Sequence, residues 1–214
     1  MTVYENMRIE REQWQMVAAL SVVAIVATLL LGLTDMATRE PIAAAKRQAL
    51  HRALQQVLPE HANDPLDDVI RIGPDAVAVY PGRDAQQQIV GVAWETVAPD
   101  GYSGSIRILM GVAPSGRIYA IRITDHRETP GLGDGIVKNQ PWLDSFIGHT
   151  IEGVRWAVKK DGGDFDQFTG ATITPRAVIK AVRKGLEFFR MHRQAILSAV
   201  NDGAAVNRQN GGVP

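Results

Sequence analysis

An uncharged run from Met16 to Leu33 constrains this chain more than any other feature of its sequence. Nothing in the run is more polar than serine or threonine. At about 1.5 Å per residue, a helix of this length nearly crosses a hydrocarbon core roughly 30 Å thick. The run therefore predicts a transmembrane helix, which we place at residues 14–33, with Trp14 as an interfacial anchor.

The flanks of this segment predict its orientation. Arg8 and Arg11 precede it and fit a cytoplasmic tail at residues 1–13, whereas a long following domain is translocated largely regardless of its charge. A cleaved signal peptide is the alternative. The run is longer than a typical signal-peptide core, and Thr34-Asp35-Met36 follows it in place of an Ala-x-Ala site. We therefore expect an uncleaved anchor, with the rest of the chain in the periplasm.

Composition excludes several classes of function. The formal net charge of the 214 residues is +0, so nothing indicates a nucleic-acid partner. Cys is absent, which removes iron–sulfur ligation, attached c-type haem and thiol catalysis. The histidines lack metal-ligand spacing, and no nucleophile–base pair is evident. We therefore predict no metal site and no catalytic residue, and expect no turnover by the isolated chain.

The remaining pattern predicts an α+β fold. Apolar residues at helical spacing predict an amphipathic stalk helix at 34–58, which docks on the domain that follows. Turn sequences separate five short runs that predict a mainly antiparallel sheet: 69–72, 76–80, 89–97, 105–112 and 117–124. Further elements complete a domain at 59–199: a short helix at 140–146, a strand at 153–159 and a long helix from Pro175 to about Ser198. Residues 200–214 predict a disordered tail.

The stretch 166–175, Asp-Gln-Phe-Thr-Gly-Ala-Thr-Ile-Thr-Pro, is the one segment whose residues indicate a specific covalent chemistry. Thr174-Pro175 is typical of a helix start, with the Thr174 hydroxyl as the cap. Thr172 comes just before it, on a turn made thin by Gly170 and Ala171. Unpaired N–H groups and the helix dipole favour a phosphate at such a place. On these residues alone, an ordinary glycine turn that leads into a capped helix is the commoner interpretation.

Asp166, Thr169-Gly170-Ala171-Thr172 and Thr174 resemble the flavinylation motif of the FMN-binding domain family. In that motif a flavin transferase takes FMN from FAD and joins its phosphate to the hydroxyl residue after Gly-Ala. The resemblance implies covalent FMN on Thr172. Asp166 has two candidate roles, recognition by the transferase or capping of the turn, and its place in the family motif favours the first. Pro175 departs from the serine that is usual there, although proline at a first helical position has the same structural effect.

Two other stretches resemble signatures of the same family: Glu-Thr-Pro-Gly-Leu-Gly at 128–133 and Gly-Tyr-Ser-Gly-Ser at 101–105. Their glycines allow positive φ and close approach of the backbone to a ligand, although any tight loop could use them. Glu128 is expected to bind loop N–H groups, and Lys159 and Lys160 either neutralise the phosphate or lie in solvent. The cofactor-binding residues that the resemblance implies are Gly104, Glu128, Thr129, Gly131, Leu132, Gly133, Thr169, Gly170, Ala171, Ile173 and Thr174.

The order of one membrane helix, a stalk and one such domain resembles the RnfG family, the G subunits of the Rnf electron transport complex. That complex couples ferredoxin and NAD oxidation–reduction to ion movement across the bacterial inner membrane. The resemblance implies a membrane-anchored electron-transfer subunit whose partners are the other subunits and the flavin transferase. Two alternatives are the C subunit of a sodium-pumping NADH:quinone oxidoreductase and an anchored assembly module without a redox role. The hydroxyl of Thr172 favours a redox subunit.

Overall fold

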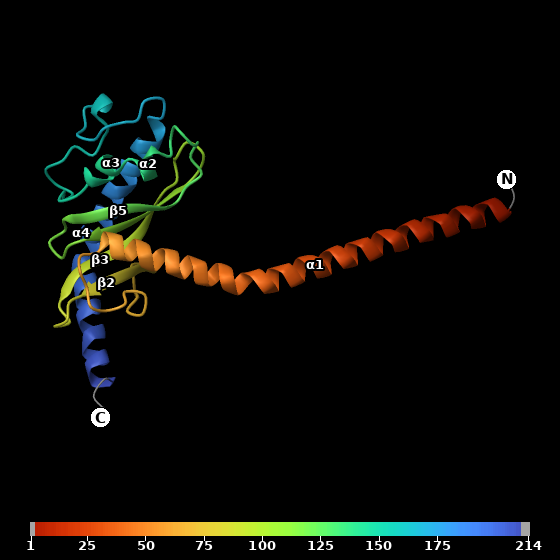
Figure 1. Cartoon of the computed structure of the whole chain (residues 1–214), viewed down its shortest axis with the longest axis horizontal. Coiled ribbons are helices and arrows are strands. Elements are labelled where there is room, and N and C mark those ends of the chain that lie inside the picture. Colours follow the sequence, from red (N-terminus) through yellow and green to blue (C-terminus); the bar gives the residue numbers. More distant parts are fainter. Residues whose placement is uncertain (1–2, 211–214) are drawn as a thin grey trace. The chain divides into compact units, whose positions relative to one another are not determined.

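The computed structural model of the chain describes residues 3–210, with side chains from 13 to 200. It consists of two compact units, Met1–Ala49 and Leu50–Pro214. Helix α1 (Val3–Val57) is continuous through both of them and contains Pro41 (Figure 1). The predicted membrane segment and the predicted stalk therefore belong to one helix.

Within the first unit, every described side chain from 13 to 49 is exposed. The helix is long and apolar enough to cross a membrane, by length and composition. The hydroxyls of Ser21 and Thr28 donate to carbonyls four residues earlier, each at 2.8 Å. Both hydroxyl protons are therefore hydrogen-bonded within the helix. A hydrocarbon environment requires this, because it offers no other acceptor. The side chains of the predicted cytoplasmic tail, residues 1–12, lie outside the described part.

The second unit is built on a five-stranded antiparallel sheet in the order of the chain. All five predicted strands are confirmed: β1 (Ile70–Ile72), β2 (Val77–Arg83), β3 (Ile89–Ala98), β4 (Ile106–Val112) and β5 (Ile118–Asp125). Strand β2 runs on through Pro81 and Gly82, where the sequence favoured a turn. Because β1 pairs only with residues 77–79, the missing N–H of Pro81 faces no neighbouring strand.

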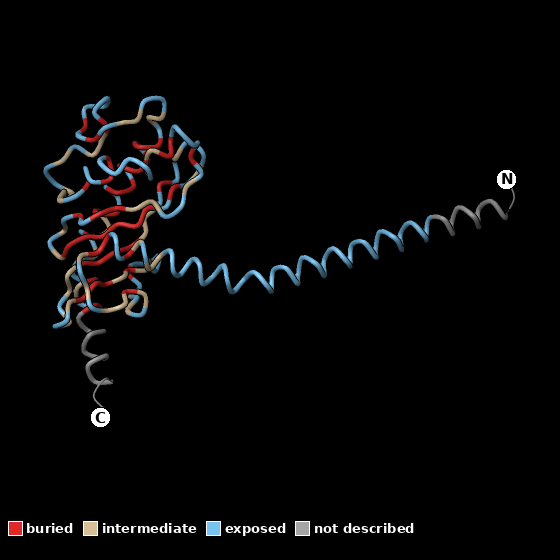
Figure 2. Tube along the Cα trace, in the orientation of Figure 1, coloured by how far each residue is buried: buried red, intermediate tan, exposed pale blue. Residues whose placement is uncertain are grey.

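One face of the sheet packs against helix α4 (Ile173–Asn210). Trp94 and Met110 on this face belong to the larger core, together with Val178, Val182 and other apolar residues of the helix. In Figure 2 the buried positions of this unit lie mainly along the strands of the sheet. Gly185 allows the close approach, since a Cβ there would lie 2.3 Å from the Met110 sulfur. The apolar side chains on this face of β3 and β4 thus hold α4 against the sheet.

The other face packs against the end of α1 that belongs to this unit. Leu54 and Val57 are fully buried on Ala93 and Leu109. A Cβ on Gly111 would lie 1.9 Å from the Val57 carbonyl oxygen, so the helix sits directly on the strand backbone. The predicted docking of the stalk is therefore confirmed for residues 50–57.

Three predicted elements differ from the structure. Residues 153–159 are not a strand, because Arg155, Ala157 and Lys159 bond to residues 164 and 165 of the next loop rather than to the sheet. A short helix α2 (Gly135–Lys138) precedes the predicted short helix, α3 (Gln140–Asp144). Helix α4 is assigned through residues 201–210 of the predicted tail, and residues 211–214 lie outside the described part.

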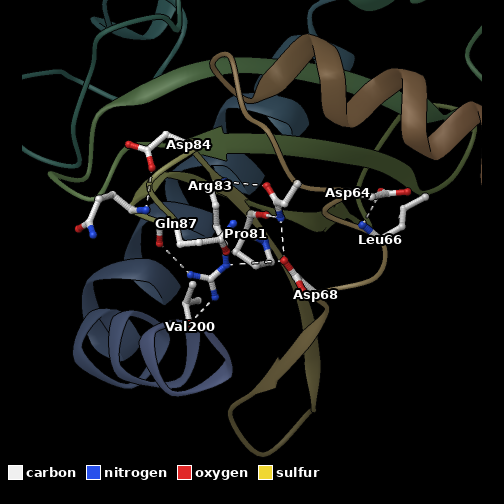
Figure 3. A network of polar contacts seen from close by, with 10 residues as sticks. Asp64, Leu66, Asp68, Pro81, Arg83, Asp84, Gln87 and Val200 are labelled. Atoms are coloured by element: carbon white, nitrogen blue, oxygen red, sulfur yellow. Dashed lines mark hydrogen bonds and ion pairs between the residues drawn. The ribbon is translucent and has the colours of Figure 1, made fainter. Parts of the chain in front are cut away.

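A buried polar network joins β2 to the C-terminal part of α4 (Figure 3). Arg83 is 3% exposed, and its guanidinium donates to the carbonyls of Val200 and Gln87. Its Nε lies 3.6 Å from the Asp68 carboxylate, to which Asn63 also donates at 2.8 Å. Paired in this way, the buried cation ties the end of β2 to α4 at Val200.

Candidate functional site

Three loops meet at the N-terminal end of α4, and a buried carboxylate joins them. Glu128 is 4% exposed, and its Oε1 accepts a hydrogen bond from the Ser103 N–H at 3.0 Å. Its Oε2 accepts from the Thr174 hydroxyl, which is also buried. Glu128 therefore joins the two glycine-rich stretches, 101–105 and 128–133, to residues 166–175, which we call the acceptor stretch.

Gly133 makes room for this carboxylate. A Cβ on Gly133 would lie 2.7 Å from Glu128 Oε2 and 3.0 Å from the Thr174 hydroxyl oxygen. Gly101 is constrained first by its own loop, because a Cβ there would lie 2.3 Å from the Gly104 carbonyl oxygen and 3.0 Å from Glu128 Oε1. Gly131 differs, because it has a φ of +79° and open space around it. Gly133 is thus required by Glu128, and Gly131 by its backbone conformation.

The loop that contains Gly131 is tied to itself. The Thr129 carbonyl accepts from the N–H groups of Leu132, Gly133 and Asp134, and the Gly131 N–H donates to the Asp134 carboxylate at 2.8 Å. Asp134 is buried and pairs with Lys138 at 2.5 Å, which lowers the pKa of its carboxyl. The loop therefore presents a defined backbone surface.

The acceptor stretch forms a narrow turn beside that loop. The Ala171 N–H donates to the Phe168 carbonyl at 3.2 Å, and Gly170 takes a φ of +79°, which the turn geometry requires. A Cβ on Gly170 would lie 3.5 Å from Leu132, so the two loops are in contact. Thr169 is exposed at the corner of the turn.

A cluster of aromatic side chains packs against this turn. Trp142 packs against Phe146 and Phe168 with ring centroids 5.0 and 5.1 Å apart, and its Nε1 donates to the Asp166 carbonyl at 2.8 Å. Phe146 in turn stacks on Phe165 at 4.6 Å. The backbone on both sides of the turn is therefore anchored to a buried cluster.

Thr172 directly precedes α4, and its hydroxyl has no hydrogen-bond partner among the described residues. The helix begins at Ile173, so Pro175 is its third residue and offers no N–H to a capping hydroxyl. Nor do the N–H groups of Ile173 and Thr174 have an acceptor in the described part of the chain. The predicted cap is wrong, because the Thr174 hydroxyl donates to Glu128 instead.

The surroundings of Thr172 combine exposed apolar groups with paired charges. Tyr102, Leu132 and Ile173 are 68%, 49% and 48% exposed, one on each of the three segments. Asp166 has a carboxylate that is 68% exposed and lies 2.7 Å from Lys159. Arg176 holds Asp161 at 2.6 Å, and the pKa of that carboxyl is lowered as a result.

The site also contains residues that the sequence did not single out. Ser103 enters through its backbone N–H, so its side chain carries no signal of the role. Asp134, two positions after Leu132, and the distant Trp142 hold the two loops. Of the predicted set, Gly104 has a φ of +131° and nothing within 4 Å of a built Cβ. Lys160 contacts the site only through its N–H, which donates to Gln167.

Comparisons with known proteins agree with this arrangement. Residues 101–187 match the FMN-binding domain, and residues 15–57 match the RnfG N-terminal region. The G subunit of the ion-translocating oxidoreductase complex of Aliivibrio fischeri is 40% identical over 190 residues, covering 83% of this chain and 90% of that protein. Its counterpart from Pseudomonas aeruginosa is 41% identical over 191 residues, covering 84% and 89%.

A solved structure shares the fold. The C subunit of the Na⁺-translocating NADH-quinone reductase of Parabacteroides distasonis superposes with a TM-score of 0.52 at 17% identity. The match covers 70% of this chain and 94% of that one.

Proposed function

Because the chain belongs to the family of G subunits of ion-translocating oxidoreductase complexes, we propose that it is a membrane-anchored electron-transfer subunit that carries covalent FMN on Thr172. Its complex is of the Rnf type, which exchanges electrons between ferredoxin and NAD and moves ions. The other subunits are its partners, and the isolated chain turns over no substrate.

The observation that carries this proposal is the state of Thr172. Its hydroxyl has no hydrogen-bond partner among the described residues, and it directly precedes a helix with two unpaired N–H groups. Such a helix N-terminus attracts a phosphate through its N–H groups and its dipole. The Thr169 hydroxyl lies at the exposed corner of the turn, without that environment. The residues present therefore fit a phosphoester at Thr172.

Attachment is a phosphoryl transfer, in which nothing is oxidised or reduced. The Thr172 oxygen bonds to the phosphorus of the FMN half of FAD, the pyrophosphate bond breaks, AMP leaves and the hydroxyl proton passes to solvent. A flavin transferase carries out this step. Recognition of Asp166 by that enzyme is supported by the exposure of its carboxylate, which among the described residues pairs with Lys159, while Trp142 holds the Asp166 backbone.

The chain's own residues then hold and shield the group. Once bound, FMN supplies one- and two-electron transfer. The N–H groups of Ile173 and Thr174 stabilise the phosphate charge. The exposed apolar side chains of Tyr102 and Leu132 offer contact area to a flat ring.

In-gel fluorescence tests the attachment. The full chain, produced with a flavin transferase, should retain flavin fluorescence after boiling in detergent. Thr172→Ala and the nearly isosteric Thr172→Val should abolish the fluorescence, and Thr172→Ser should retain part of it. The matched control Thr169→Ala should stay labelled. Fluorescent Thr172→Ala protein would show that the acceptor is another residue, and an unlabelled wild-type chain would favour an assembly module.

Topology is a separate part of the proposal. The apolar segment of α1 is the anchor, the N-terminus is cytoplasmic and the domain is periplasmic in the bacterial inner membrane. Protease added to intact spheroplasts should degrade the chain after about residue 34 and should spare it in inverted vesicles. The opposite pattern would remove the periplasmic assignment.

A further inference from the structure

Glu128 is a buried carboxylate that the attachment chemistry does not use. It is 4% exposed, and no Lys, Arg or His side chain forms an ion pair with it among residues 13–200. A buried charge without a cation is costly unless hydrogen bonds satisfy it. Its presence here therefore requires an explanation beyond packing.

Three residues from three segments are adapted to this one carboxylate. The Ser103 N–H and the Thr174 hydroxyl donate to its two oxygens. Gly133 lacks the Cβ that would lie 2.7 Å from Oε2 and 2.9 Å from the Glu128 Cβ. Because an alanine at Gly133 would displace the carboxylate, this glycine is explained by Glu128 rather than by general packing.

The bond to Thr174 acts on the start of α4. Thr174 lies in the first turn, two residues after Thr172, and the Thr172 carbonyl already accepts from the Arg176 N–H at 3.4 Å. The first turn is one hydrogen-bonded unit, so its placement determines where the Thr172 side chain leaves the helix. The hydroxyl of Thr172 makes no bond of its own in the described part of the chain, so only its backbone positions it.

We propose that Glu128 is the positioning residue for the Thr172 acceptor. Through Thr174 it holds the first turn of α4 so that the Thr172 hydroxyl is presented to the flavin transferase. Glu128 does not bond to the acceptor oxygen and takes no proton from it. This inference rests on the proposed function, in which FMN is attached at Thr172.

The test measures the kinetics of attachment to the full chain. Purified protein in detergent is incubated with FAD and a purified bacterial flavin transferase, and the initial rate of covalent labelling is read as in-gel fluorescence at increasing chain concentration. Glu128→Gln should lower the saturating rate roughly tenfold or more, because displacement by an ångström can cost that much. The chain concentration at half-maximal rate should stay unchanged. Asp166→Asn should show the reverse, a raised half-maximal concentration with an unchanged saturating rate.

Variants of Thr174 distinguish a positioning role of Glu128 from a purely stabilising one. Thr174→Val removes only the hydroxyl at nearly constant shape and should lower the saturating rate as Glu128→Gln does. Thr174→Ser restores the donor and should return the rate close to that of the wild type. The control is Arg83→Met, which breaks the buried network at the other end of α4. It should lower the Tm at least as much and still be labelled at the wild-type rate.

Several outcomes would overturn the inference. Wild-type saturating rates for both Glu128→Gln and Thr174→Val would show that Glu128 does not position the acceptor. A fall in rate that follows the Tm in all variants, Arg83→Met included, would reduce Glu128 to a stabilising residue. If Glu128→Gln does not fold, the pair Thr174→Val and Thr174→Ser decides, because each changes a single group. An unlabelled wild-type chain would instead remove the proposed function itself.

Discussion

Within the part of α4 whose side chains are described, residues 173–200, each end is held by one buried charged side chain, but the two side chains have different partners. At the C-terminal end of that part, Arg83 is paired with Asp68 and donates to the carbonyl of Val200 (Figure 3). At the N-terminal end, Glu128 has no cation among the described side chains and accepts from a hydroxyl and a backbone N–H. The paired end gains stability, whereas the end without a cation leaves the helix N-terminus free for an anion. A charged residue buried in this domain is therefore not, by itself, a sign of a cofactor site.

The largest expected effect is at the C-terminal end. Arg83→Met removes one partner of a buried ion pair and leaves Asp68 and the Val200 carbonyl without it, which should lower the free energy of unfolding by about 3 kcal/mol. Chemical denaturation of the detergent-solubilised chain measures this loss. FMN attachment should be unaffected. A loss of attachment in folded Arg83→Met protein would mean that the two ends are coupled through α4.

At the N-terminal end, Gly133→Ala should cost about 2 kcal/mol, because its Cβ would overlap with the Glu128 carboxylate. The same substitution should reduce covalent labelling. Gly131→Ala is the matched control, since its Cβ would meet nothing within 4 Å and only its positive φ is strained, at a cost of about 1 kcal/mol. Equal labelling of the two variants would contradict the role given to Glu128.

Trp142→Phe should have a smaller effect. It keeps an aromatic ring against Phe168 but removes the 2.8 Å bond to the Asp166 carbonyl, a loss of about 1 kcal/mol. Hydrogen exchange should increase at residues 166–172 while that of the β2 and Val200 region stays the same. If exchange at residues 166–172 is the same in the variant and in the wild type, the turn does not depend on this bond.

Lowering the pH is expected to have the smallest effect on stability. Asp100, Asp134 and Asp161 have lowered pKa values because Lys180, Lys138 and Arg176 bond to their carboxylates, and all three lie toward the N-terminal end of α4. Their contribution to stability is present above the ordinary carboxyl pKa of 3.8 and is lost as the pH falls through the lower folded values. Carbon-13 NMR titration of these carboxyls should give midpoints below 3.8, which added salt moves back upwards. Midpoints at or above 3.8 would mean that these pairs do not form in solution.

Local patterns in the sequence predicted most elements of the fold. Short apolar runs at 89–97 and 105–112, bounded by turns, are enough to predict β3 and β4, and the runs are nearly continuous because α4 covers one face of the sheet and the end of α1 covers the other. The prediction of a strand at 153–159 is wrong because this segment pairs with a neighbouring loop. Its backbone groups bond to residues 164 and 165, and this local pairing competes with the sheet.

For the acceptor stretch, local patterns predicted the turn and Thr172 but not the contacts of Thr174. Thr172 and its glycine turn were found because a motif carries them in consecutive positions. General capping rules, applied to Thr174-Pro175, predicted the cap at Thr174 and the helix start at Pro175, whereas α4 begins at Ile173 and Thr174 bonds to Glu128. No spacing rule relates residues 128 and 174, which are 46 positions apart.

What the sequence by itself determined is the apolar membrane segment, the strands of the sheet and the hydroxyl on a thin turn. These depend on periodicity and on residue types that are close along the chain. Only the tertiary structure decided which groups surround that hydroxyl: the carboxylate of Glu128, the N–H of Ser103 and the missing Cβ of Gly133. The physical reason is that a buried charge must find its hydrogen-bond donors wherever the fold brings them, and contacts between distant segments leave no local pattern.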